Sequence, residues 1–138
     1  MAFGADDVLY RRGCDRLIYS KQEYEWMLLS DMEASTMSAS KDALYIAEKH
    51  SKMPYKFDTR SGQFKQIGNR KVDMLAAGVS NHVVMEGRNQ NFRFGGIYGW
   101  VETDNAWRNL GGGSVDWLAS GYQGRLYKVA YPSLKVFQ

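Results

Sequence analysis

The residues EYEWMLLSDMEASTMSASKDALYIAEKHSKMPYKFDTRSGQFKQI, numbered 23–67, predict a strand, a helix and a hairpin in succession. The strand is Glu23–Leu28, where polar or flexible residues alternate with large apolar ones. Successive side chains of a strand point to opposite faces, so one face would carry Tyr24, Trp26 and Leu28. The polar, short-chained stretch that follows, residues 30–39, predicts a loop, with a helical continuation as the alternative.

A helix of about residues 40–51 is the main feature expected of this segment. Four residues recur at the i, i+3, i+4, i+7 spacing of one helix face: Ala43, Ile46, Ala47 and His50. Ser40 is a suitable N-cap, and Pro54 prevents the helix from continuing. The small alanines on the buried face would let this helix lie close to a sheet.

Strands are expected to dominate the rest of the chain. Residues 55–57 and 63–65 alternate in polarity around the turn residues 59–62, which is typical of a hairpin. Residues 82–85 and 91–101 predict a second hairpin. Together with the helix, these patterns predict an α+β fold in which one main helix packs on an antiparallel sheet.

The C-terminal part adds shorter features. Residues 125–131 and 134–137 predict two last strands, while Asp104–Trp107 predicts one helical turn and residues 109–114 a glycine loop. No internal repeat is expected. The whole chain, residues 1–138, is expected to form a single domain, because a chain of this length buries about two-thirds of its unfolded surface.

The composition indicates a globular protein made in a reducing compartment. Apolar residues make up 44% of the chain and aromatic residues 14%. Cys14 is the only cysteine, so it cannot close a disulfide within the chain. The first twenty residues lack the pattern of a secretory signal, and no apolar run approaches the roughly 20 residues that a spanning helix needs. We expect a protein that is cytoplasmic at synthesis and has no membrane partner.

The net charge of +3 is concentrated in the middle of the chain. Residues 41–71 hold eight basic side chains against three acidic ones. A basic segment of this kind suits nucleic acid or an acidic protein surface, although a solvated face would have the same composition. The candidate nucleic-acid-binding residues are Lys49, Lys52, Lys56, Arg60 and Lys65.

No constellation of catalytic residues emerges. Residues 109–114 lack the lysine of a phosphate-binding loop. Cys14 with His50 or His82 is the only thiol–base combination, and none of the three lies in a recognisable motif. Glu102 beside two tryptophans is a weak candidate for sugar hydrolysis. We therefore expect no catalytic residue, no bound metal and no cofactor.

Aromatic residues at a spacing of two suggest a contact surface in the second half of the chain. Residues 92–100 carry four aromatic side chains that a strand would place on one face. This face could be the core of a sheet, a stacking platform for single-stranded nucleic acid or an interface with another chain. The candidate interface residues are Tyr98, Trp100, Trp107, Trp117 and Tyr122.

Three classes of function follow, in order of preference. The first is a non-enzymatic structural or assembly protein that acts through contacts with other protein chains, as in a homo- or hetero-oligomer. A small virion component associated with a capsid or tail is one such protein. The second is a basic accessory protein that binds nucleic acid, and the third is a small hydrolase.

Overall fold

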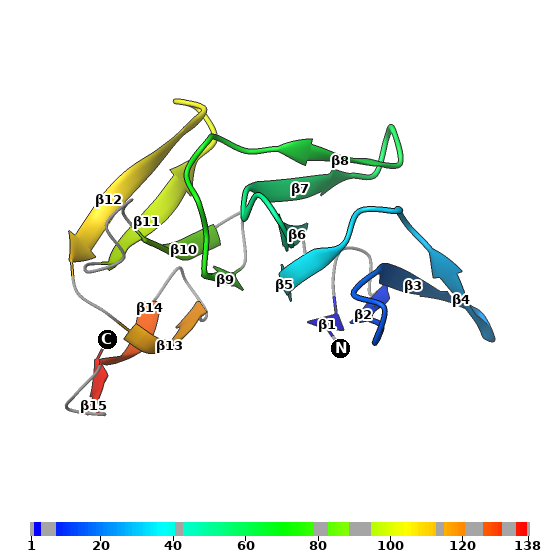
Figure 1. The fold of residues 1–138 in the computed structure, drawn as a ribbon, viewed down its shortest axis with the longest axis horizontal. Helices are drawn as coiled ribbons and strands as arrows, with labels where there is room; N and C mark the ends of the chain where they lie inside the picture. The colour runs from blue at the N-terminus through cyan, green and yellow to red at the C-terminus, as the bar shows by residue number, and fades with distance from the viewer. Residues whose placement is uncertain are drawn as a thin grey trace.

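A computed structural model describes residues 2–3, 8–40, 43–78, 83–88, 95–112, 115–120, 126–130 and 135–137. Within these residues every regular element is a β-strand, and the strands form four antiparallel sheets in chain order (Figure 1). The fold is therefore mostly antiparallel β-sheet, and the expected α+β class with a main helix is wrong.

Each sheet is a meander in which every strand pairs with the next one along the chain. The first sheet comprises β1 (Ala2–Phe3), β2 (Leu9–Arg12), β3 (Ile18–Gln22) and β4 (Glu25–Leu28). The second comprises β5 (Ala34–Ala39), β6 (Leu44–Glu48), β7 (Pro54–Asp58) and β8 (Gln63–Gln66). The third comprises β9 (Met74–Ala77), β10 (Val83–Arg88), β11 (Gly95–Val101) and β12 (Ala106–Gly112). The fourth comprises β13 (Val115–Ser120), β14 (Leu126–Ala130) and β15 (Lys135–Phe137).

The four sheets follow one another along an arc (Figure 1). Their first strands lie on the inside of the arc, where β1 contacts β5, β5 contacts β9 and β9 contacts β13. The last strands β4, β8 and β12 lie on the outside. Antiparallel meanders set side by side in this way resemble successive blades of a β-propeller, although the arc here is open.

Two hydrophobic cores join the first three sheets. One core lies between the first and second sheets and includes Tyr10, Ile18, Leu44 and Ile46. The other lies between the second and third sheets and includes Ala43, Tyr45, Ala47, Val72, Leu75 and Trp100. The second sheet is therefore buried on both faces, with alternate residues of β6 supplying the two cores.

This burial on both faces explains why the predicted helix at residues 40–51 is wrong. Leu44–Glu48 is the strand β6, whose first four residues are all buried. A strand with two apolar faces does not alternate in polarity, so its sequence resembles that of a buried helix. Ser40 is also a turn residue here, since its hydroxyl accepts a hydrogen bond from the Ala43 amide over 3.2 Å.

Other expectations were partly right. Within the predicted strand Glu23–Leu28, β4 confirms Glu25–Leu28, whereas Glu23 and Tyr24 form the turn before it. The hairpin of residues 55–57 and 63–65 is confirmed by β7 and β8. The pairing of β10 with β11 confirms the second hairpin in its described residues, and β14 and β15 are the expected last strands.

Two local expectations were wrong. The loop predicted for residues 30–39 contains β5. The helical turn and much of the glycine loop predicted for residues 104–114 are replaced by β12, which runs from Ala106 to Gly112.

The sequence also contains an internal repeat that was not expected. Phe64, Ile67-Gly68 and Val72-Asp73 recur, at constant spacing, as Trp107, Leu110-Gly111 and Val115-Asp116. A more divergent copy begins at Trp26 and includes two further residues at corresponding positions, Leu29 and Ala34. Each copy covers the last strand of one sheet and the first strand of the next. The repeat therefore encodes the junction between neighbouring sheets.

Candidate contact surface on the first sheet

In the second and third sheets, a pair of aromatic rings faces the preceding sheet. Phe57 lies opposite Phe64 with ring centroids 5.1 Å apart, and the two rings pack against the core between the first and second sheets. Trp100 lies opposite Trp107 with centroids 5.3 Å apart, and this pair belongs to the core between the second and third sheets. These pairs occupy equivalent positions in the repeat.

The equivalent pair in the first sheet contains a cation. Lys21 lies opposite Trp26, and the Lys21 Nζ is 5.6 Å from the centre of the Trp26 ring. The Arg11 guanidinium lies 4.5 Å from the centre of the same ring and 5.4 Å from that of Tyr19. A cation over an aromatic face is attracted by the ring quadrupole. Contacts between cations and rings thus replace the ring–ring contact of the other two sheets.

These residues belong to a surface that we call the outer face of the first sheet. It consists of Arg11, Tyr19, Lys21, Trp26 and Leu28, which share one face because Arg11 pairs with Tyr19, Tyr19 with Leu28, and Lys21 with Trp26. On the opposite face, Tyr10 and Ile18 are buried in the core with the second sheet, while Met27 at the strand edge is exposed. None of the five outer-face residues belongs to either core, and Leu28 is 52% exposed.

The positive charge of Arg11 has no carboxylate partner at ion-pair distance among the described side chains. Its Nε–H group is buried and donates no hydrogen bond to the described residues. The nearby Asp15 accepts hydrogen bonds from the Tyr19 hydroxyl over 2.5 Å and from the Leu17 amide over 3.1 Å. The Tyr19 bond, then the Leu17 bond, hold the pKa of Asp15 below its ordinary value, and the same Asp15 bond raises the pKa of Tyr19. Asp15 is thus an anion whose oxygens are already bonded.

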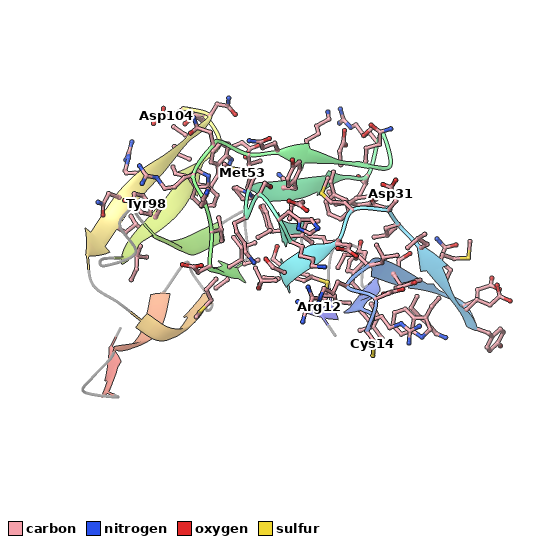
Figure 2. The ribbon with its side chains drawn as sticks, in the orientation of Figure 1. Arg12, Cys14, Asp31, Met53, Tyr98 and Asp104 are labelled. Carbon is pink, nitrogen blue, oxygen red and sulfur yellow. The ribbon has the colours of Figure 1, made fainter. Side chains whose placement is uncertain are left out.

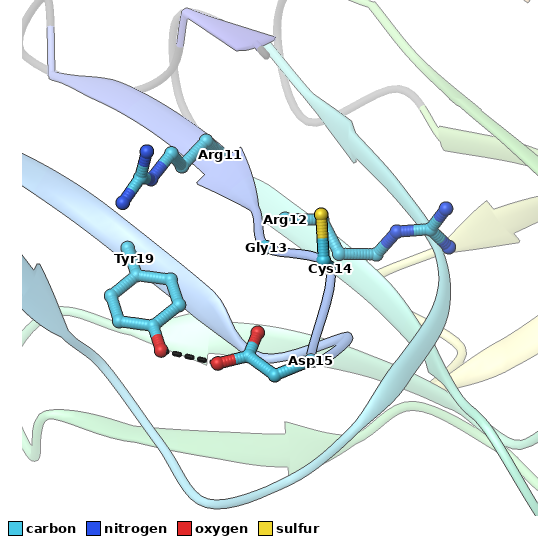
Figure 3. A pocket seen from close by; sticks show the side chains of 6 residues that line it. All are labelled: Arg11, Arg12, Gly13, Cys14, Asp15 and Tyr19. Carbon is cyan, nitrogen blue, oxygen red and sulfur yellow. Dashed lines mark hydrogen bonds between the residues drawn. The ribbon is translucent and has the colours of Figure 1, made fainter.

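A shallow hollow of about 500 Å³ lies next to the outer face. It is lined by Arg11, Arg12, Gly13, Cys14, Asp15 and Tyr19 (Figure 3). Figure 3 shows Arg11 and Arg12 extending in different directions, with the Tyr19 hydroxyl directed at Asp15. Arg12 donates hydrogen bonds to the backbone carbonyls of Ala34 and Ser35, so it ties the first sheet to the second instead of facing the hollow.

The outer face ends at a strand edge that is open for pairing. β4 is the last strand of its sheet, and the Leu29 amide donates to the Ile18 carbonyl over 2.9 Å. Hydrogen-bonded and non-hydrogen-bonded pairs alternate in an antiparallel ladder, so the backbone groups of Trp26 and Leu28 point away from β3. An edge of this kind, with apolar side chains beside it, is a template for another chain.

The interface residues predicted in the second half lie mostly inside the chain. Trp100 is 7% exposed in the second core, and Trp107 and Tyr98 pack against that core. The Arg70 guanidinium lies 4.1 Å from the centre of the Tyr98 ring and donates to its hydroxyl. The side chain of Trp117 and the whole of Tyr122 lie outside the described residues.

Three of the five candidate nucleic-acid-binding residues have acidic partners. The shortest nitrogen–oxygen distances are 3.0 Å for Lys49 with Glu33, 3.8 Å for Lys56 with Glu102 and 2.9 Å for Lys65 with Asp58. In the described part of the chain, Lys52 and Arg60 have no ion pair.

The residues considered for catalysis lie on separate elements. Cys14 is exposed in the turn between β2 and β3, while His50 lies in the turn between β6 and β7, 3.6 Å from Glu33. Cys14 belongs to the first sheet, and Asp104 and Tyr98 to the third, at opposite sides of the view in Figure 2. His82 lies outside the described residues, as do the aromatic residues 92 and 94.

The described residues contain no cluster of three or more His, Cys, Asp or Glu side chains suited to a metal ion. They also contain no helix with the length and apolar character needed to cross a membrane.

Sequence reasoning missed most of the outer face. Trp26 and Leu28 were placed together on one strand face, but Arg11 and Lys21 were not connected with them. The missing signal was the repeat, which aligns Trp26 with Phe64 and Trp107.

Comparisons with known proteins assign no relative. No protein-family model matches the chain, and no curated protein matches it significantly.

Proposed function

We propose that the protein is a non-enzymatic assembly protein that contacts other copies of itself through the outer face of the first sheet. A virion is one setting for such an assembly, and this assignment remains a prediction from the sequence. The observation that supports the proposal is the position of the outer face in the repeat. At the two equivalent positions within the chain, the same kind of face packs against a neighbouring sheet.

The chemistry of the outer face indicates what kind of surface would pack there. Leu28 and the Trp26 ring offer apolar area, which drives association when it is removed from water. Arg11 and Lys21 lie over the same ring, and Arg11 has no described carboxylate at ion-pair distance. The matching surface is therefore an apolar sheet face with at least one acidic side chain placed against Arg11.

The experiment measures the mass of the full chain in solution by light scattering, from about 1 to about 100 µM. Wild-type protein is expected to gain mass with concentration. Leu28→Ser is expected to abolish this gain, and Arg11→Gln to weaken it. The association should also weaken as salt is added, because the contact includes charges.

Met27→Ser is the matched control. Met27 is the neighbour of Leu28 on β4 and is 45% exposed, but its side chain points to the opposite face of the strand. It should leave the association unchanged. A wild-type protein that stays monomeric at every concentration would contradict the proposal. So would a Met27→Ser variant that loses as much association as Leu28→Ser does. Melting temperatures measured in parallel separate lost association from lost folding.

A further inference from the structure

The strand β4 combines an open backbone edge with exposed apolar side chains. Among the described elements its main contact is with β3, and Figure 1 shows it at the right-hand end of the molecule. Tyr24, in the turn before β4, is 93% exposed, Leu28 is 52% exposed and Met27 is 45% exposed. In the described part of the chain, Leu110 is the only other exposed large hydrophobic residue. The edge of β4 is therefore where apolar side chains and backbone groups without a strand partner meet.

The edge strands of the second and third sheets differ from β4 in carrying a cation. β8 carries Lys65, whose side chain is 69% exposed, and contains no exposed large hydrophobic residue. β12 carries Arg108, whose side chain is 67% exposed. A charged side chain, lysine above all, protects an edge strand against pairing with another chain. β4 contains no cation and lacks this protection.

The Trp26 ring also lacks an aromatic neighbour within its own sheet. In the second and third sheets, the ring of the last strand lies opposite a ring of the preceding strand, whereas Trp26 lies opposite Lys21. The backbone groups of Trp26 and Leu28 point away from β3, towards the open edge. A strand that paired there could place a second ring directly opposite Trp26.

A second copy of β4 fits this edge, because the strand is complementary to itself in one register. Residues opposite each other in a sheet point to the same face, so an antiparallel pair of identical strands is centred on a single residue. Centring on Glu25 would oppose two carboxylates, which is destabilising, and centring on Met27 would place Trp26 opposite Leu28. Centring on Trp26 opposes the two indole rings and places Glu25 opposite Met27, away from the other carboxylate.

We propose that β4 pairs antiparallel with β4 of a second copy, centred on Trp26, so that two first sheets become one continuous sheet. The pairing rests on the proposed self-association and specifies its register. Trp26 and Leu28 exchange backbone hydrogen bonds across the twofold axis, and Leu28 lies opposite Tyr24 of the second copy. Both open edges are used in this contact, so it closes as a dimer.

Disulfide cross-linking tests the register, in a Cys14→Ser background that removes the only native cysteine. Glu25→Cys and Met27→Cys are prepared as separate proteins, mixed, and oxidised with oxidised glutathione. Residues 25 and 27 bond inward to β3, so across the twofold axis they form a non-hydrogen-bonded pair. The Cα atoms of such a pair are about 4.5 Å apart, which a disulfide can span. The mixture should therefore give a linked dimer.

Each variant alone should give little linked dimer, because its two thiols would lie roughly 7 Å out of register along the strand. A mixture of Gln63→Cys and Lys65→Cys is the matched control, since these residues have the same spacing on the edge strand β8. This control mixture should not link. The melting temperature of each variant, compared with that of Cys14→Ser, shows that it is folded.

Linking in the control mixture, or in Met27→Cys alone as readily as in the test mixture, would overturn the pairing centred on Trp26. Absence of linking while the mass of the wild type still rises with concentration would also overturn the strand pairing, but would leave the contact through the outer face intact. A wild-type protein that stays monomeric would overturn both.

Discussion

The indole nitrogen of Trp107 lies 2.8 Å from the backbone carbonyl oxygen of Ile67, forty positions earlier in the chain. This hydrogen bond joins the last strand of the third sheet to the end of the second. The Trp107 ring fits closely because Gly68 has no side chain and takes a φ of +79°. The hydrogen bond from Trp107 to the Ile67 carbonyl and the close packing of its ring on Gly68 therefore stabilise the same junction.

Replacing this glycine should be costly for two separate reasons. Gly68→Ala places a β-carbon against Trp107 and also forces alanine into a left-handed conformation. We expect a loss of about 2–5 kcal/mol in the free energy of unfolding, measured by urea denaturation. Gly62→Ala isolates the conformational part, because Gly62 has a φ of +70° with no atom within 4 Å of the added carbon. Gly62→Ala should lower the free energy of unfolding by only about 1–2 kcal/mol. If Gly68→Ala costs no more than Gly62→Ala, the close packing of Gly68 under Trp107 contributes nothing to stability.

The strand β6 should be sensitive to substitution on both faces. Ile46 is fully buried in the first core and Ala47 in the second. Ile46→Ala is expected to cost about 2–5 kcal/mol, and Ala47→Asp to be at least as destabilising because it buries an unpaired carboxylate. Lys49→Gln removes only a partly exposed ion pair with Glu33 and should cost about 1 kcal/mol or less. Denaturation curves in which Ile46 or Ala47 tolerates substitution would contradict burial on that face.

Stability should fall at acidic pH through Asp58 and Glu48. The Lys65 ammonium, the Arg60 amide and the Ser61 hydroxyl donate to the Asp58 carboxylate and lower its pKa from 3.8 to about 2. Partial burial acts to raise the pKa of Glu48, but hydrogen bonds from the Ser51 and His50 amides outweigh it and lower that pKa to about 2.

Both groups favour the folded state when ionised, so their contribution is complete above about pH 4.5 and is lost as the pH falls towards about 2. Asp58→Asn is expected to lower the melting temperature at pH 6 and to flatten its decline between pH 5 and about 2. The same scan of Glu48→Gln gives the second contribution. If the melting temperature of the double variant Asp58→Asn, Glu48→Gln falls with pH as steeply as that of the wild type, these two carboxylates are not the source of the decline.

The hypothesis of nucleic-acid binding makes a prediction about salt. If Lys49, Lys52, Lys56, Arg60 and Lys65 all contact phosphates of a single strand, each contact adds about 0.7 to the slope of log affinity against log salt. Replacing Lys52 and Arg60 with glutamine should then reduce the slope measurably in oligonucleotide titrations. No binding at low salt, or a slope near zero, would remove this hypothesis.

The sequence predicted strands well where one face of the strand is polar. The hairpin of β7 and β8 alternates because polar or charged side chains such as Lys56 and Lys65 separate its aromatic ones, and it was predicted correctly. In β6 the two faces are covered by different sheets, so the alternation disappears and a helical spacing arises by chance. Local periodicity carries no information about a second covering sheet.

The candidate site was harder to predict for a related reason. Tryptophans are common both in cores and at interfaces, so composition alone could not separate Trp100, which is buried, from Trp26, which lies on the outer face. Strand pairing makes the distinction, since Lys21 lies opposite Trp26, whereas Phe57 lies opposite Phe64 and Trp100 opposite Trp107. A charged residue at a position where the other copies are aromatic marks the face that meets something other than its own chain's core.

The meander topology has a consequence for how the molecule comes apart. Among the described residues, each sheet pairs strands that follow one another and packs on the sheets next to it, so cooperative coupling decays along the arc. Such a chain frays from its ends, and the second sheet, which lies between two cores, opens late. In native-state hydrogen exchange, the amides of β6 should therefore exchange near the global unfolding rate, whereas those of β4 exchange through local openings.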